Sequence, residues 1–96
     1  MIIGLFNLTL GACVGPAPLE DYTLAYTSLE AARAARASKF APGYLNQAED
    51  YYRQALVDFE DRRYKEARDN FTRARKFAEK AENYTVLKKA ETGESE

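Results

Sequence analysis

Cys13 is the only cysteine in the 96-residue chain, and its thiol is the most reactive side-chain group that the sequence offers. It follows the small residues Gly11 and Ala12, which close an apolar N-terminal run from Ile2 to Leu10. This run is too short to span a membrane, which takes about 20 residues, and its small-residue end is typical of a secretory signal. A single cysteine forms no disulfide within the chain. The position therefore favours processing and modification of one thiol.

The segment that ends at Cys13, Leu-Gly-Ala-Cys, resembles the lipobox of bacterial lipoproteins. The resemblance implies that residues 1–12 are a signal peptide, cleaved before Cys13, and that the sulfur receives a diacylglyceryl group. Val14 stands where an aspartate would retain an enterobacterial lipoprotein at the inner membrane. By resemblance we therefore expect a lipid anchor in the outer membrane, on its periplasmic face. No lysine or arginine lies between Met1 and the apolar run, whereas such a signal usually begins with a basic residue.

Other reactive side chains form no recognisable site. The chain has no histidine, so a histidine–cysteine zinc site lacks its ligands. Adjacent carboxylates occur at 49–50 and 60–61, but neighbouring helix positions diverge by about 100°, so each pair splits across the surface. The five glycines are scattered and form no phosphate-binding loop. We expect no catalytic residue, no metal and no cofactor, and the chain is not predicted to be an enzyme.

The composition predicts one small helical domain with a thin core. Sixteen residues are alanine, and eleven aromatic residues follow Cys13. Rings set against alanines indicate closely approaching helices, with large side chains filling the space that small neighbours leave. Domains of this size bury little surface and are marginally stable. The net charge of −1 gives no bias toward nucleic acid.

Proline and hydrophobic spacing divide the chain into three predicted helices. Residues 13–18 form a short proline-containing tether, and a first helix is expected over 19–39, ending before Pro42. Apolar steps of three and four residues predict helices at 42–60 and 63–89. The short link between these two helices predicts an antiparallel hairpin. The polar residues 90–96 are predicted to be a disordered acidic tail. The fold class is therefore all-α.

The last predicted helix resembles part of a known repeat. Tyr64-x2-Ala67-x3-Phe71-x2-Ala74 is similar to the second-helix signature of tetratricopeptide repeats. The same form begins 42 residues earlier at Tyr22, whereas the repeat period of that family is about 34 residues. The resemblance implies a helical hairpin closed through small residues. We expect Ala67 and Ala74 to face a set on the preceding helix: Ala48, Tyr52 and Ala55.

A more diffuse resemblance covers residues 21–84. The pattern Ala41-Pro42, the series of alanines and Tyr64-Lys65-Glu66-Ala67-Arg68 are similar to a family of small alanine-rich helical lipoproteins with a domain of unknown function. Members often occur with outer-membrane proteins of the OmpA-like type. The resemblance implies location and architecture, with an OmpA-like protein as one possible partner, and it implies no chemistry.

Two lines of aromatic residues lie beside the main apolar faces. Tyr44 and Tyr51 are seven residues apart on one helix, and Phe77 and Tyr84 are seven apart on the next. Either the first helix covers these lines, or they form an exposed aromatic groove that receives a partner helix or peptide.

Charge is also unevenly distributed. Residues 62–89 have a net charge of +6, whereas residues 14–61 have −4. Either the carboxylates of helix 42–60 face the cations of helix 63–89, or a basic ridge at Arg73, Lys76 and Lys80 meets an anionic envelope partner.

These observations favour a lipid-anchored periplasmic adaptor or structural module that binds another envelope protein. The expected partner-binding residues are the two aromatic pairs and the basic ridge: Tyr44, Tyr51, Phe77, Tyr84, Arg73, Lys76 and Lys80. The alternatives are a pilotin-like lipoprotein that targets an outer-membrane secretion or pilus channel, and a self-associating coiled-coil spacer.

Overall fold

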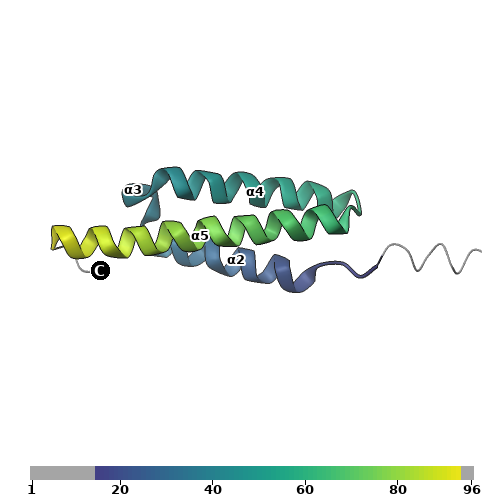
Figure 1. The fold of residues 1–96 in the computed structure, drawn as a ribbon, viewed down its shortest axis with the longest axis horizontal. Coiled ribbons are helices and arrows are strands. Elements are labelled where there is room, and N and C mark those ends of the chain that lie inside the picture. Colours follow the sequence, from purple (N-terminus) through teal and green to yellow (C-terminus); the bar gives the residue numbers. More distant parts are fainter. Residues whose placement is uncertain (1–14, 94–96) are drawn as a thin grey trace, which may run out of the picture.

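The computed structural model describes residues 15–93, and every regular element within them is an α-helix. The helices are α2 (Leu19–Ala34), α3 (Ala37–Phe40), α4 (Pro42–Glu60) and α5 (Tyr64–Thr92). The all-α prediction is confirmed, with three long helices and one single-turn helix (Figure 1). The predictions for the signal peptide 1–12, for Cys13 and for the end of the tail lie outside the described residues.

Helices α4 and α5 form the predicted antiparallel hairpin (Figure 1). The turn between them follows the Schellman pattern, in which orphan carbonyls at a helix end accept bonds from the chain beyond it. The N–H of Arg62 donates to the carbonyl of Phe59 at 3.0 Å, and the N–H of Arg63 donates to the carbonyl of Asp58 at 2.8 Å. Arg62 adopts the left-handed conformation that this motif requires, with φ of 63°.

Replacing Arg62 with glycine is expected to raise the free energy of unfolding by about 1 kcal/mol, because glycine lacks the Cβ that makes left-handed backbone costly. The exposed Arg62 side chain makes no hydrogen bond or ion pair within residues 15–93, so little is lost with it. Urea unfolding followed by circular dichroism measures the change. Arg63→Gly is the matched control: φ there is −91°, and glycine is expected to reduce stability. Equal effects at both positions would contradict the strain argument.

The single helix predicted over 19–39 is wrong, because the chain breaks at Arg36. Helix α2 ends at Ala34, and Arg36 takes a left-handed φ of 73° before α3 begins. No glycine or proline marks this break in the sequence. The turn buries Ala37 completely. Helix α4 then begins at Pro42, five residues later. Burial of small side chains, which local sequence does not encode, therefore sets the position of the break.

The predicted boundary between the last helix and the tail is also wrong, because α5 continues to Thr92. Residues 90–92 are helical, whereas their polar sequence predicts a disordered tail. The helix stops at Gly93, which has φ of 78°, the conformation that commonly follows a helix end. Glycine rather than the change in polarity marks the end of the helix.

Helix α5 is the central element and packs against both α4 and α2, which meet each other much less (Figure 1). The buried residues fall into two clusters. One lies toward the α4–α5 turn: Ala25, Ala55, Ala67, Phe71 and Ala74. The other lies toward α3: Leu29, Ala32, Ala37, Ala41, Leu45, Ala48, Ala78 and Ala81. Both tetratricopeptide-like segments thus direct their alanines into the core. Ala67 and Ala74 lie with Ala55 and Tyr52 as predicted, whereas Ala48 lies in the other cluster, one step farther along the hairpin.

Asp58 is a buried carboxylate between α4 and α5, with only 1% of its surface exposed. Its oxygens accept hydrogen bonds from Gln54 at 3.0 Å and from Asn70 at 2.8 Å, and Arg63 lies 3.9 Å away. A buried charge is tolerated when it is paired and hydrogen-bonded, so these contacts fix the register of the hairpin near its turn.

Candidate partner-binding face

Four aromatic side chains form a continuous row along one edge of the α4–α5 hairpin, which we call the aromatic strip: Tyr44, Tyr51, Phe77 and Tyr84. Tyr51 stacks on Phe77 with ring centroids 5.6 Å apart. Tyr44 lies 6.5 Å from Phe77 and 6.1 Å from Tyr84, the latter in an edge-to-face arrangement. Spacing of seven residues on each helix thus brings the two predicted pairs together. They interleave across the hairpin as one surface.

The strip is exposed at one end and partly buried at the other. Tyr44 and Tyr84 are 38% and 41% exposed, whereas Tyr51 and Phe77 are half-buried and pack against the two core clusters. Tyr51 and Phe77 therefore contribute to the core, and Tyr44 and Tyr84 are the accessible members.

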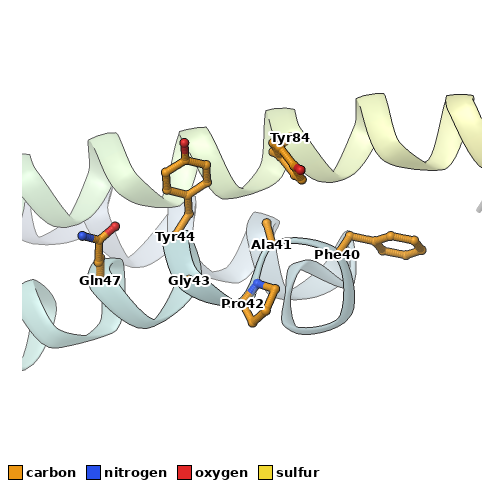
Figure 2. Close-up of a pocket in the computed structure, with 7 residues that line it drawn as sticks. All are labelled: Phe40, Ala41, Pro42, Gly43, Tyr44, Gln47 and Tyr84. Atoms are coloured by element: carbon orange, nitrogen blue, oxygen red, sulfur yellow. The ribbon is translucent and has the colours of Figure 1, made fainter.

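The exposed end of the strip borders a depression of about 550 Å³. Figure 2 shows Tyr44 rising from α4 toward α5, beside Tyr84, with Gln47 one turn along α4. The remaining lining comes from the end of α3, the linking residue and the first turn of α4: Phe40, Ala41, Pro42 and Gly43. A depression with aromatic walls, a neutral amide from Gln47 and the tyrosine hydroxyls suits a peptide segment that has both apolar and polar side chains.

Cations lie over these rings. The guanidinium carbon of Arg73 is 5.9 Å from the Tyr51 ring centre, and the ammonium of Lys80 is 5.3 Å from that of Phe77. Lys80 also lies 5.9 Å from the centre of Tyr44. Lys76 is exposed and contacts no ring within the described part of the chain. Two of the three predicted basic residues therefore join the strip directly.

Helix α2 does not cover the aromatic strip, because it packs along the opposite edge of the hairpin. Its Tyr22 contacts Tyr52 and Phe71, with ring centroids 6.2 and 5.7 Å apart. Asp21 of α2 approaches Arg68 of α5 at 3.7 Å. The alternative in which the first helix hides the strip is therefore wrong.

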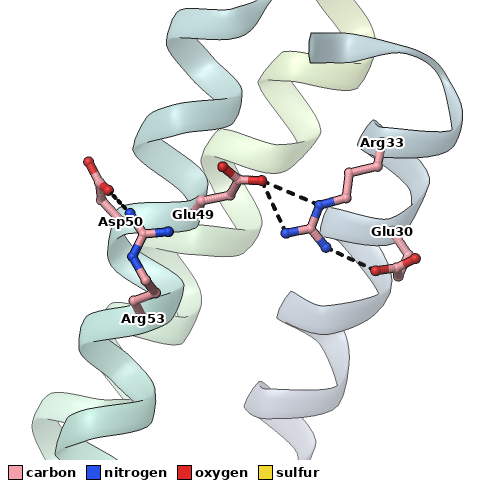
Figure 3. Close-up of polar contacts among 5 residues, drawn as sticks. All are labelled: Glu30, Arg33, Glu49, Asp50 and Arg53. Atoms are coloured by element: carbon pink, nitrogen blue, oxygen red, sulfur yellow. Dashed lines mark hydrogen bonds and ion pairs between the residues drawn. The ribbon is translucent and has the colours of Figure 1, made fainter.

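The expectation that carboxylates of helix 42–60 face cations of helix 63–89 holds for Asp58, which lies 3.9 Å from Arg63, but it is wrong for the acidic pair at 49–50. Glu49 accepts two hydrogen bonds from Arg33 of α2, at 3.3 and 3.1 Å, and Arg33 also bonds Glu30 at 2.9 Å (Figure 3). Asp50 pairs with Arg53 on its own helix. Because α2 packs along the edge of the hairpin that Glu49 faces, the cation that pairs with Glu49 is Arg33 of α2 and not a residue of α5. Glu49 and Asp50 thus diverge, as predicted from helix geometry.

The α2 edge carries its own aromatic group, in which Tyr22 stacks near both Tyr26 and Tyr52. Burial raises the pKa of the Tyr52 hydroxyl to about 12, and hydrogen bonding with Tyr22 acts in the same direction. The ring contacts of Tyr22 with Tyr52 and Phe71 join α2 to the hairpin. A smaller depression of about 360 Å³ follows this edge, lined by Leu19, Tyr22, Leu56, Phe59 and Glu60.

Sequence reasoning missed two contributors to the strip. Lys88 lies 5.7 Å from the ring centre of Tyr84, four residues earlier on α5, and pairs with Glu91 at 3.8 Å. Gln47 lines the depression beside Tyr44. The i, i+4 spacing from Tyr84 was a signal for Lys88, whereas nothing in the sequence distinguishes Gln47.

Residues 15–93 contain no group of three side chains arranged to hold a metal ion. No helix in that range combines the length and apolar character needed to cross a membrane. The chain matches no protein-family model, no curated protein and no solved structure.

Proposed function

We propose that this protein is a lipid-anchored adaptor of the bacterial envelope, which holds another envelope protein against the aromatic strip. The supporting observation is the continuous row of rings whose two end members, Tyr44 and Tyr84, remain exposed beside a depression. Rings bury much area at little conformational cost, which is why tyrosine is enriched among the residues that dominate protein interfaces.

The lipobox-like segment supports the anchor. Acylation at Cys13 would attach the chain upstream of α2, with residues 14–18 between the anchor and that helix. The exposed end of the strip lies at the other end of the bundle, where α4 begins and α5 runs past it (Figure 1). An anchored chain of this shape presents its binding surface away from the lipid attachment.

Replacing Tyr44 and Tyr84 together with alanine is expected to abolish the partner contact while the helices stay folded. Loss of two interface anchors costs about 2 kcal/mol or more, which is a fall of about thirtyfold in binding. A photoreactive residue at Gln47, which lines the same depression, reports the contact by crosslinking in intact cells. Mass spectrometry then identifies the crosslinked protein.

The matched control replaces Leu24 and Tyr26, which are 46% and 48% exposed on α2, with alanine. This variant is expected to keep the crosslink, and circular dichroism is expected to show equal helix content in both variants. A crosslink that survives loss of Tyr44 and Tyr84 contradicts the proposal. A crosslink to a second copy of the chain identifies the self-associating spacer instead.

A further inference from the structure

We infer that the partner binds through an acidic segment, which lies along α5 against three unpaired cations that we call the cation row: Arg73, Lys76 and Lys80. This inference rests on the proposed function and adds the chemistry of the partner. The row and the aromatic strip form one surface, because Arg73 and Lys80 lie over rings of the strip.

The three cations of the row have no carboxylate partner within residues 15–93, which is also true of Arg36, Arg62 and Lys89, but the row is the group that lies beside the aromatic strip. Lys65 pairs with Asp69 at 3.3 Å, and Arg75 pairs with Glu79 at 3.1 Å, both on α5. The remaining ion pairs leave out the row as well, since they involve Arg33, Arg53, Arg63, Arg68 and Lys88. The one polar contact of the row is a hydrogen bond from Arg73 to Asn70 at 3.1 Å. Its positive charge is therefore available to an external carboxylate.

Spacing places the row on one side of α5. Steps of three and four residues keep the three side chains together, and the seven residues from Arg73 to Lys80 span about 10 Å of helix. A carboxylate-bearing segment that runs along the helix can meet all three cations at once.

Two exposed carboxylates lie close to the row in sequence or beside its rings, and both are already paired: Asp69, four residues before Arg73, pairs with Lys65, and Asp50, next to Tyr51, pairs with Arg53. Gln47 is neutral, and the carboxylate of Asp58 is buried and already bonded to Gln54 and Asn70. Glu91, farther along α5, pairs with Lys88. The surface thus combines positive charge with aromatic area.

This combination favours a protein segment over a lipid surface. Interleaved rings and a depression of about 550 Å³ at Tyr44 and Tyr84 accept apolar side chains that alternate with carboxylates. A headgroup layer offers negative charge but no such side chains. The complementary ligand is an amphipathic segment with carboxylates beside an apolar face.

The test uses the full chain and two synthetic helical peptides. The acidic peptide carries glutamates along both borders of a leucine face, and the comparison peptide has glutamine at every glutamate. The acidic peptide is expected to bind about tenfold more tightly, because three partly exposed charge contacts add modest amounts each. The preference is expected to shrink as salt rises.

Two triple variants with the same change in net charge distinguish binding at the cation row from nonspecific electrostatic attraction between the protein and the acidic peptide. Arg73→Gln, Lys76→Gln and Lys80→Gln together are expected to remove the preference for the acidic peptide. Arg53→Gln, Lys65→Gln and Arg75→Gln together neutralise cations that are already paired, and are expected to preserve it.

Three results would overturn the inference: equal affinity for the two peptides, equal loss in both triple variants, or row-dependent binding to phosphatidylglycerol vesicles without any peptide preference. The last result would assign the row to lipid. The crosslink from Gln47 separates this test from the proposed function. If it needs Tyr44 and Tyr84 but survives loss of the row, the adaptor role stands and the acidic partner does not.

Discussion

Replacing Ala67 with aspartate is expected to unfold the helical bundle. The Ala67 side chain is completely buried on α5, in the cluster that contains Ala55 and Phe71. A carboxylate there would lie among apolar atoms, and an uncompensated buried charge typically costs about 3–5 kcal/mol. Whole domains are stable by only about 5–15 kcal/mol, and small ones lie toward the lower end. The substitution therefore removes most of the stability available.

Circular dichroism at physiological temperature and a thermal melt measure the effect. Ala90→Asp is the matched control, because it makes the same chemical change at an exposed position near the end of α5. Its cost is expected to stay below about 1 kcal/mol, from helix propensity and the charge at the helix end. Equal melting temperatures for the two variants would show that Ala67 does not lie in the core.

Hydrophobic spacing was sufficient to predict α4 and the hairpin. Pro42 and the three- and four-residue steps that follow it lead to a helix that the structure places at Pro42–Glu60. The break at Arg36 was not predictable, because the sequence there holds ordinary helix-forming residues and the reason for the turn is burial of Ala37. Local signals mark elements that begin or end at proline or glycine, and they miss those that tertiary packing determines.

The four aromatic residues of the candidate site were predictable as a set but not as an arrangement, and Lys88 and Gln47 were missed. Seven-residue spacing correctly grouped Tyr44 with Tyr51 and Phe77 with Tyr84. Which edge of the hairpin α2 occupies depends on contacts far apart in the chain, such as Arg33 with Glu49. That choice leaves the aromatic strip open and gives Glu49 a partner on α2 instead of α5. One sequence contains no signal for it.

Replacing Cys13 with serine is expected to release the protein from the membrane. Serine closely matches cysteine in size but provides no sulfur for a thioether to the diacylglyceryl group. The chain has no second cysteine to take its place. One acyl chain alone gives marginal, reversible attachment, whereas two or three give a durable anchor. Full acylation should therefore place the wild-type protein almost entirely in the membrane fraction, and the variant should lose that anchor.

Intact mass of membrane-extracted wild-type protein supplies the direct measurement, since it should show loss of residues 1–12 and the added mass of acyl chains. Tyr44→Ala with Tyr84→Ala provides the control, because those side chains lie far along the bundle and their loss should leave the acyl mass unchanged. An uncleaved chain with a free thiol at Cys13 would contradict the anchor. The proposed anchor and the aromatic strip can thus be tested separately, because the proposed anchor depends on one sulfur upstream of α2, whereas the strip depends on rings that α4 and α5 bring together.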